Sequence, residues 1–358
     1  MGSLAGRDLI SIADLSAAEI TEVLDVASAL KAGADPGRPL AGRNLAMIFQ
    51  RPSNRTRVSF EVAVRHLGGH PIPLFNSEIQ IGERESTADI SRILDRYVDG
   101  IVARLSHHRD LVTMARAARG PVVNAITDRE HPCQVLADCL TVRELLGHLA
   151  GARVCYVGDG NNVCTSWIYA AALLGIDLRV VGPEGYEPHP AVLERAEALA
   201  GGGSTVRLSH EAAASLEDAE IIYTDVWTSM GQEAEQQQRR DDFAHLQVND
   251  GLLAQAPPTA KVMHCLPAHR GEEITDSVLD GPQSVVFDQA ENRLWAQEAL
   301  LSLIFSGELP TGRAAGRGGL IPSLLNSSTA PWSSSGRSAS VTSSISSSSP
   351  SCCISSSS

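Results

Sequence analysis

Short apolar runs and helical spacings of apolar residues alternate along most of the chain. Residues 44–49 form a nearly continuous apolar run of the kind that becomes a buried strand. Apolar positions between 58 and 67 then recur at helical spacing and end at Gly68-Gly69, where a helix is expected to stop. The stretch between them, residues 50–57, is polar and lies where that helix begins. The pattern therefore predicts a repeated order of strand, polar turn and helix.

The same pattern predicts further strands, each followed by polar residues. The expected strands are residues 44–49, 70–75, 100–104, 121–126, 153–157, 177–182, 205–209, 220–224, 261–265 and 284–288. Prolines in the second of these favour a position near a sheet edge. Because helices separate the strands, we expect parallel sheets covered on both faces. The predicted fold class is α/β, with two domains, each a mostly parallel sheet flanked by helices.

Capping residues and glycines delimit several helices. Ser16 and Glu19 form a capping box at the start of the first helix. A long helix is expected from His131 to Gly147. Another helix is expected to begin at Ser86 or Thr87, and its inner face should carry Ile90, Ile93, Leu94 and Tyr97.

Polar loops and a change of composition set the remaining boundaries. Residues 76–87 are expected to be a polar loop, and residues 225–240 a polar loop able to close over a site. The predicted domains are residues 1–148 and 149–310, with a last helix at about 290–306. Residues 311–358 are rich in serine and have little to bury, so they are expected to be disordered.

Composition narrows the class of protein. The chain has 358 residues, 43% of them hydrophobic and 20% charged, as in a soluble globular protein. Its net charge of −13 argues against nonspecific binding of nucleic acid or of an anionic membrane surface. We find no export signal and no bilayer-spanning apolar run, so a cytoplasmic location is expected. The 7 cysteines show no CxxC spacing, which weakens a zinc or redox-pair interpretation.

Polar groups gather at the predicted carboxyl ends of strands, where open α/β sheets bind ligands. They are Ser53 to Arg57, Arg104, His131 with Gln134, Asn161-Asn162, Asp225 and Cys265. A helix that begins with hydroxyls and arginines suits a phosphate, because its first N–H groups and the guanidiniums all favour an anion. A plain surface turn with solvated arginines remains the alternative for this stretch alone.

Two other stretches each allow two interpretations. Gly158-Asp159-Gly160 resembles the start of a dinucleotide-binding loop, with Asp177 as the candidate ribose ligand. It also fits a tight strand-to-helix turn, which would leave the side chains of Asn161 and Asn162 facing the cleft. Cys265, at a strand end after His264, is either a buried apolar residue or a thiol that exchanges a proton with a substrate.

Four motifs, taken together, carry a resemblance to a known family. Ser-x-Arg-Thr-Arg at 53–57, His-Pro-x-Gln at 131–134, Asp-x-x-x-Ser-Met-Gly at 225–231 and His-Cys-Leu-Pro at 264–267 resemble the aspartate/ornithine carbamoyltransferase (transcarbamoylase) family. The last two motifs are similar to its ornithine branch. The resemblance covers residues 7–307 and implies a carbamoyl phosphate-binding domain followed by an ornithine-binding domain, with the last helix returning to the first domain. It also implies homotrimers or multiples of trimers.

The resemblance also implies roles for individual residues. Its carbamoyl phosphate ligands are Ser53, Asn54, Arg55, Thr56, Gln80, Arg104, His131, Gln134, Cys265, Leu266 and Arg293, with Gln80 reaching a neighbouring subunit's site. Its ornithine ligands are Asn162, Asp225, Ser229 and Met230. Cys265, Arg104, His131 and Arg55 would be catalytic, and Arg57 would help to hold the leaving phosphate. Asn54 departs from the family's usual Thr or Leu.

The implied reaction is attack by the neutral δ-amine of L-ornithine on carbamoyl phosphate, giving L-citrulline and phosphate in arginine metabolism. It needs no metal or organic cofactor, because the leaving group is already activated. Cys265 would accept the amine's proton, and Asp225 would pair with the α-ammonium group. The alternatives are transfer to putrescine, acetylornithine or aspartate, an NAD-dependent dehydrogenase, and a non-catalytic binding protein on the same fold.

Overall fold

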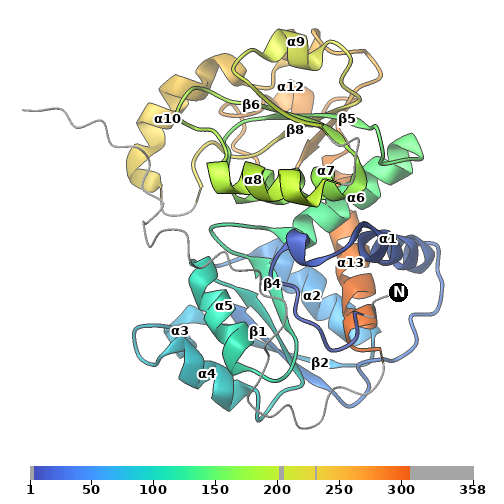
Figure 1. The fold of residues 1–358 in the computed structure, drawn as a ribbon, viewed down its shortest axis with the longest axis vertical. Helices are drawn as coiled ribbons and strands as arrows, with labels where there is room; N and C mark the ends of the chain where they lie inside the picture. The colour runs from blue at the N-terminus through green and yellow to red at the C-terminus, as the bar shows by residue number, and fades with distance from the viewer. Residues whose placement is uncertain (1–3, 201–204, 230–231, 307–358) are drawn as a thin grey trace, which may run out of the picture. The chain divides into compact units, whose positions relative to one another are not determined.

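The computed structural model describes residues 4–200, 205–229 and 232–306. This part of the chain contains two parallel sheets, with strand orders β2-β1-β3-β4 and β7-β6-β5-β8-β9 (Figure 1). The strands are β1 (Asn44–Phe49), β2 (His70–Phe75), β3 (Gly100–Arg104), β4 (Val122–Ile126), β5 (Arg153–Val157), β6 (Asp177–Val181), β7 (Thr205–Ser209), β8 (Ile221–Thr224) and β9 (Lys261–His264). The α/β class with mostly parallel sheets is confirmed.

Helices connect these strands. The α-helices are α1 (Ala17–Lys31), α2 (Asn54–His66), α3 (Asn76–Ile79), α4 (Thr87–Leu94), α5 (His108–Ala117), α6 (Pro132–Leu146), α7 (Asn162–Leu174), α8 (Pro190–Leu199), α9 (Ala212–Leu216), α10 (Gln236–Phe243), α11 (Asp250–Leu253), α12 (Asp276–Leu279) and α13 (Val286–Ile304). Short 3-10 turns are η1 (Ile12–Asp14), η2 (Glu233–Glu235) and η3 (Ala244–Leu246). None of these helices combines the length and apolar character needed to cross a bilayer.

Strand register in the first sheet brings two predicted site segments together. β1 is buried from Leu45 to Phe49, and Phe49 pairs with Arg104 at the end of β3. The turn that follows β1 and the residue Arg104 therefore lie at the same end of the sheet, where the carboxyl ends of β1 and β3 meet. β2 lies at the other side of β1 as an edge strand, as its prolines predict.

Strand register in the second sheet brings three other predicted site segments together. Val157 of β5 pairs with Thr224 of β8, and Thr224 pairs with His264 of β9. The chain leaves all three strands at one edge, so the turn at Gly158, Asp225 and Cys265 are neighbours.

The helix caps follow the sequence signals closely. Ser16 and Glu19 form the expected capping box of α1. Ser53 caps α2, and its side-chain oxygen accepts a hydrogen bond from the Thr56 N–H. α6 begins with Pro132 and ends at Gly147, which adopts a left-handed conformation. α13 packs against α1, α2 and α6, and Figure 1 shows it beside α1 and α2.

Four details of the sequence prediction are wrong. Residues 284–288 are not a strand: Ser284 forms one isolated bridge to Val262, and α13 already begins at Val286. The β-branched run at this point favours a strand locally, but packing of the helix decides. Residues 76–79 form the one-turn helix α3, where the Glu78 carboxylate accepts from the Phe75 N–H, so the loop is shorter than predicted.

The third error concerns the inner face of α4, and the fourth the second polar loop. Ile90 is buried as expected, but Ile93 is 50% exposed and Tyr97 is 71% exposed and lies beyond the end of the helix. The predicted loop at 225–240 contains η2 and the start of α10. Its polar sequence hid the helix because only Arg239 and Phe243 of α10 are buried. The predicted disorder of residues 311–358 lies outside the described residues.

Candidate active site

The start of α2 is joined to α13 at the first candidate subsite. The Ser53 side chain caps the helix by accepting from the Thr56 N–H at 3.3 Å. Arg293 Nη2, from α13, donates to Thr56 Oγ1 at 2.8 Å, and both residues are buried. The first turn of α2 lies shortly after the end of β1, and its remaining N–H groups stand at the positive end of the helix dipole. This is the arrangement that binds a phosphate.

Three arginines crowd beside that helix start. Burial, together with the positive charges of Arg293 and Arg55, lowers the pKa of Arg104 to about 10. Burial, followed by the charge of Arg55, also lowers the pKa of Arg293. The Nε atoms of Arg55 and Arg293 are buried and have no hydrogen-bond partner in the described part of the chain. Like charges placed together with unsatisfied donors indicate a site for an anion.

His131 lies against the same cluster. Burial lowers its pKa well below the usual range, and the charges of Arg293, Arg104 and Arg55 add to this effect. The imidazole is therefore neutral at physiological pH and can donate a hydrogen without carrying charge. Its backbone N–H donates to Ser166 Oγ at 2.9 Å, which ties the start of α6 to α7.

Gln134 lies one turn further along α6 and is almost fully buried. Its Nε2 donates to Asp138 Oδ1 at 2.8 Å. Its Oε1 is buried and has no hydrogen-bond partner among the described residues. The amide therefore holds a buried acceptor that a ligand could satisfy.

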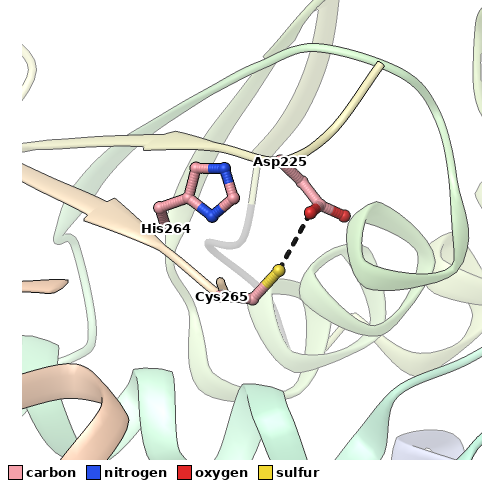
Figure 2. A group of neighbouring side chains, drawn as sticks. All are labelled: Asp225, His264 and Cys265. Atoms are coloured by element: carbon pink, nitrogen blue, oxygen red, sulfur yellow. Dashed lines mark hydrogen bonds between the residues drawn. The ribbon is translucent and has the colours of Figure 1, made fainter. Parts of the chain in front are cut away.

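The second candidate subsite is a thiol and carboxylate pair at the edge of the second sheet. Cys265 Sγ donates to Asp225 Oδ1 at 2.9 Å (Figure 2). Burial raises the pKa of Cys265 well above its usual value, and the charge of Asp225 raises it further. The thiol is therefore protonated in this structure. For Cys265 to accept a proton, as the sequence predicts, its own hydrogen must pass to Asp225. Asn161 Nδ2 donates to the other carboxylate oxygen at 2.7 Å.

Asp225, His264 and Cys265 offer ligand atoms within 4.8 Å of one another, as a metal site would. The two ring nitrogens of His264 are both engaged, however. Nδ1 accepts from the Leu266 N–H at 2.8 Å, so Nε2 carries the hydrogen and donates to Glu273 at 3.0 Å. Figure 2 shows the thiol pointing toward the Asp225 carboxylate. His264 thus supports the loop after β9 and has no lone pair left for a metal.

The other predicted site residues differ in their surroundings. Asn162 and Ser229 are half-buried near the second subsite: Asn162 Nδ2 donates to the Thr127 carbonyl at 2.6 Å, and the Ser229 N–H donates to Gln232 Oε1 at 3.0 Å. Leu266 follows Cys265 with a positive φ of 56°. Met230 lies outside the described residues.

Of the remaining predicted residues, Asn54 and Gln80 are exposed and Arg57 is partly exposed. Asn54 is exposed at the first position of α2. Gln80 is exposed after α3, with a left-handed backbone. Arg57 lies 4.0 Å from the Glu61 carboxylate, and its guanidinium lies over the Phe75 ring; its contact with the leaving phosphate stays a prediction.

The glycine-rich turn after β5 is filled by the chain itself. A Cβ on Gly160 would lie 2.3 Å from the backbone nitrogen of Pro188. Gly160 therefore lacks a side chain because residues 187–188 pack against it, not because a cofactor needs the space. Asn161 points inward and caps α7 while binding Asp225, and Asn162 binds the Thr127 carbonyl. The prediction that both asparagines face an open cleft is therefore wrong for Asn161.

Several supporting residues could not be identified as such from the sequence. Asp138 binds Gln134, Tyr223 and Gln289 in one buried group. In a second group, Arg239 binds Asp159 and the carbonyl of Trp227, two residues after Asp225. The i,i+4 spacing of Gln134 and Asp138 was the one available signal. The other contacts join residues far apart in the chain.

Comparison with known proteins decides the family. The model of the aspartate/ornithine carbamoyltransferase carbamoyl-P binding domain matches residues 7–144, and that of the Asp/Orn binding domain matches residues 150–304. The chain belongs to the aspartate/ornithine carbamoyltransferase family. Within this family it is 51% identical over 309 residues to the anabolic ornithine carbamoyltransferase of Pyrococcus furiosus, covering 85% of this chain and 98% of the relative.

Other members of the carbamoyltransferase family agree. The ornithine carbamoyltransferase of Thermosynechococcus vestitus is 51% identical over 302 residues, which is 84% of this chain and 97% of that one. The solved structure of the Pyrococcus furiosus enzyme matches with a TM-score of 0.82 at 50% identity, over 86% of this chain and 100% of the other. That of the Thermus thermophilus enzyme matches with a TM-score of 0.75 at 44% identity, over 82% and 97%. The transcarbamoylase fold is thereby confirmed.

Proposed function

We propose that this chain catalyses transfer of the carbamoyl group from carbamoyl phosphate to the δ-amine of L-ornithine, giving L-citrulline and phosphate. The observation that carries the proposal is the cluster of Arg55, Arg104 and Arg293, each within electrostatic range of Cys265 in its pair with Asp225. Within the described part of the chain, the buried Nε atoms of Arg55 and Arg293 have no hydrogen-bond partner. The relatives named ornithine carbamoyltransferase support the choice of substrates. The description of the Pyrococcus furiosus relative as anabolic supports a place in arginine biosynthesis.

In this proposal the start of α2 and the arginines bind carbamoyl phosphate. Ser53, Asn54 and Thr56 supply N–H groups and hydroxyls to the phosphate, and Arg55 neutralises its charge. Arg104 and His131 donate to the carbonyl oxygen, which becomes negative as the amine attacks. Arg293 and the Leu266 backbone complete the pocket. Gln80 would reach the site of a neighbouring subunit.

The second sheet binds ornithine in this proposal. Asn162, Ser229 and Met230 hold the amino acid head, and Asp225 pairs with its α-ammonium group. The δ-amine must lose a proton before it attacks, since its ordinary pKa is roughly 10. The Cys265–Asp225 pair takes that proton: the sulfur accepts it as the thiol hydrogen passes to Asp225 Oδ1. The amine nitrogen then forms a bond to the carbamoyl carbon and gives its second proton to the departing phosphate, which leaves with the electrons of the C–O bond.

Two further parts of the proposal come from the family. We place the chain in a homotrimer or a multiple of trimers, and in the cytoplasm. Sedimentation equilibrium of the full chain measures the first. A mass that is not a multiple of three protomers would contradict it.

A substrate panel tests the activity. The full chain is incubated with carbamoyl phosphate and, in separate reactions, L-ornithine, putrescine, acetylornithine or aspartate, and each carbamoylated product is measured. We expect citrulline to form at least tenfold faster than any other product, because Ser229 and Asp225 recognise a free amino acid. Faster reaction with putrescine would replace ornithine as the substrate. Saturable binding of NAD⁺ without any carbamoyl transfer would favour a dehydrogenase instead.

A further inference from the structure

The side-chain amide of Gln134 has a donor end, Nε2, and an acceptor end, Oε1. Among the described residues, only the donor end has a hydrogen-bond partner. Nε2 donates to Asp138 Oδ1 at 2.8 Å. Oε1 has no hydrogen-bond partner in the described part of the chain, and solvent does not replace one because Gln134 is only 1% exposed. A buried amide oxygen left without a donor is costly, so its position calls for a ligand that supplies an N–H.

Asp138 fixes which end of the amide faces the ligand. It is fully buried, and its Oδ1 also accepts from Gln289 Nε2 at 2.7 Å. Its Oδ2 accepts from the Tyr223 hydroxyl at 3.0 Å. These contacts come from α13 and β8, so the carboxylate is held from two directions besides its own helix.

The charge state of Asp138 strengthens this preference. Burial raises its pKa, and hydrogen bonds from Gln134, Gln289 and Tyr223 and the charge of Arg293 oppose this effect, so that the pKa is about 6. Above that pH the side chain is a carboxylate, which only accepts hydrogen bonds. A flipped Gln134 would place its oxygen against this carboxylate, with no hydrogen between them. The amide is therefore held with its NH₂ toward Asp138 and its oxygen away from it.

We propose that Asp138 is a positioning residue that turns the Gln134 oxygen toward the NH₂ of the carbamoyl group, so that the site selects carbamoyl phosphate over acyl phosphates of the same shape. The inference rests on the proposed function. Acetyl phosphate is the matching probe, because a methyl group replaces the NH₂ and cannot donate to Gln134 Oε1. A site with an oriented acceptor discriminates against such an analogue because its buried oxygen would stay unpaired.

The test measures binding of carbamoyl phosphate and of acetyl phosphate by calorimetry at pH 8, in the full chain and its variants. Asp138→Leu removes the acceptor, and we expect it to weaken carbamoyl phosphate binding about tenfold or more while acetyl phosphate binding changes less than about twofold. Asp138→Asn keeps an acceptor without the charge, and the preference for carbamoyl phosphate should fall only about threefold to fivefold. If Asp138→Leu does not fold, the change in Asp138→Asn decides.

A matched control separates positioning from general damage to α6. Thr141→Val lies one turn further along the same helix and removes a buried hydroxyl that donates to the Ala137 carbonyl and accepts from Asn292. It should lower stability without changing the ratio of the two dissociation constants. The inference is overturned if the Asp138 variants weaken both ligands equally, or if their ratio matches that of wild type. Wild-type protein that binds neither ligand would instead contradict the proposed function.

Discussion

Arg293 and Thr56 are 237 residues apart in sequence and share a buried 2.8 Å hydrogen bond. The bond joins the middle of α13 to the first turn of α2, where the phosphate subsite is proposed. The Arg293 pKa is lowered by burial and by the charge of Arg55, so the guanidinium is held in place against electrostatic repulsion. The hydroxyl of Thr56 thus both orients a cation and completes the helix start.

Replacing Thr56 by valine tests this relationship. Thr56→Val leaves a buried guanidinium N–H without its acceptor, so we expect the free energy of unfolding to fall by about 1–3 kcal/mol. Carbamoyl phosphate binding should weaken as well, because Arg293 loses its anchor. Urea unfolding and calorimetry measure the two effects. Thr56→Ser keeps the hydroxyl and should restore most of both, and equal losses in the serine and valine variants would contradict the assigned role.

The thiol of Cys265 is expected to act in proton transfer. Cys265→Ala removes the atom that bonds Asp225, so kcat should fall about 10²-fold while the Kd of carbamoyl phosphate stays within about twofold. Steady-state kinetics with ornithine, together with calorimetry, separate these effects. Cys155→Ala is the matched control, because Cys155 is also buried, on β5, but lies in another apolar cluster. An alanine variant at 265 as active as this control would remove Cys265 from the mechanism.

Glu130 makes stability depend on pH. It is almost fully buried, accepts from the Ile12 N–H at 3.0 Å, and burial raises its pKa from 4.5 to about 8. A carboxyl group with a raised pKa in the folded state favours folding fully below pH 4.5, and this contribution is lost as pH rises through about 8. The Glu130→Gln variant has no ionisable group at this position. The difference between its Tm and that of wild type should therefore be larger at pH 9 than at pH 5.

The control for this shift is an exposed carboxylate. Glu217→Gln, at the end of α9, should show the same Tm difference from wild type at both pH values, because Glu217 is exposed. A Glu130→Gln difference that is equally independent of pH would show that Glu130 does not take up a proton on folding.

Local signals in the sequence were sufficient for the elements that carry the site. The capping side chain of Ser53, the Pro132 start of α6 and the apolar run of β1 each act within a few residues, so each could be read directly. Strand order was not needed to place Asp225 and Cys265 at strand ends. Their 2.9 Å contact depends on the pairing of β8 with β9, which only the structure provides.

Errors arose where distant contacts override local preference. Val285 and Val286 favour a strand by type, yet Val286 is buried in the first turn of α13. The group of Asp138, Tyr223 and Gln289 draws on α6, β8 and α13, and no periodicity in one segment reveals it.

The central claim is that Arg55 holds an activated phosphate for attack by ornithine. Citrulline formation from carbamoyl phosphate and L-ornithine is measured for wild type, Arg55→Ala and Arg65→Ala, the last being an exposed arginine on the same helix. The account predicts a rate loss of at least about 10²–10³-fold in Arg55→Ala and a rate near wild type in Arg65→Ala. Wild-type protein that makes no citrulline, or an Arg55→Ala variant within about tenfold of wild type, would contradict it.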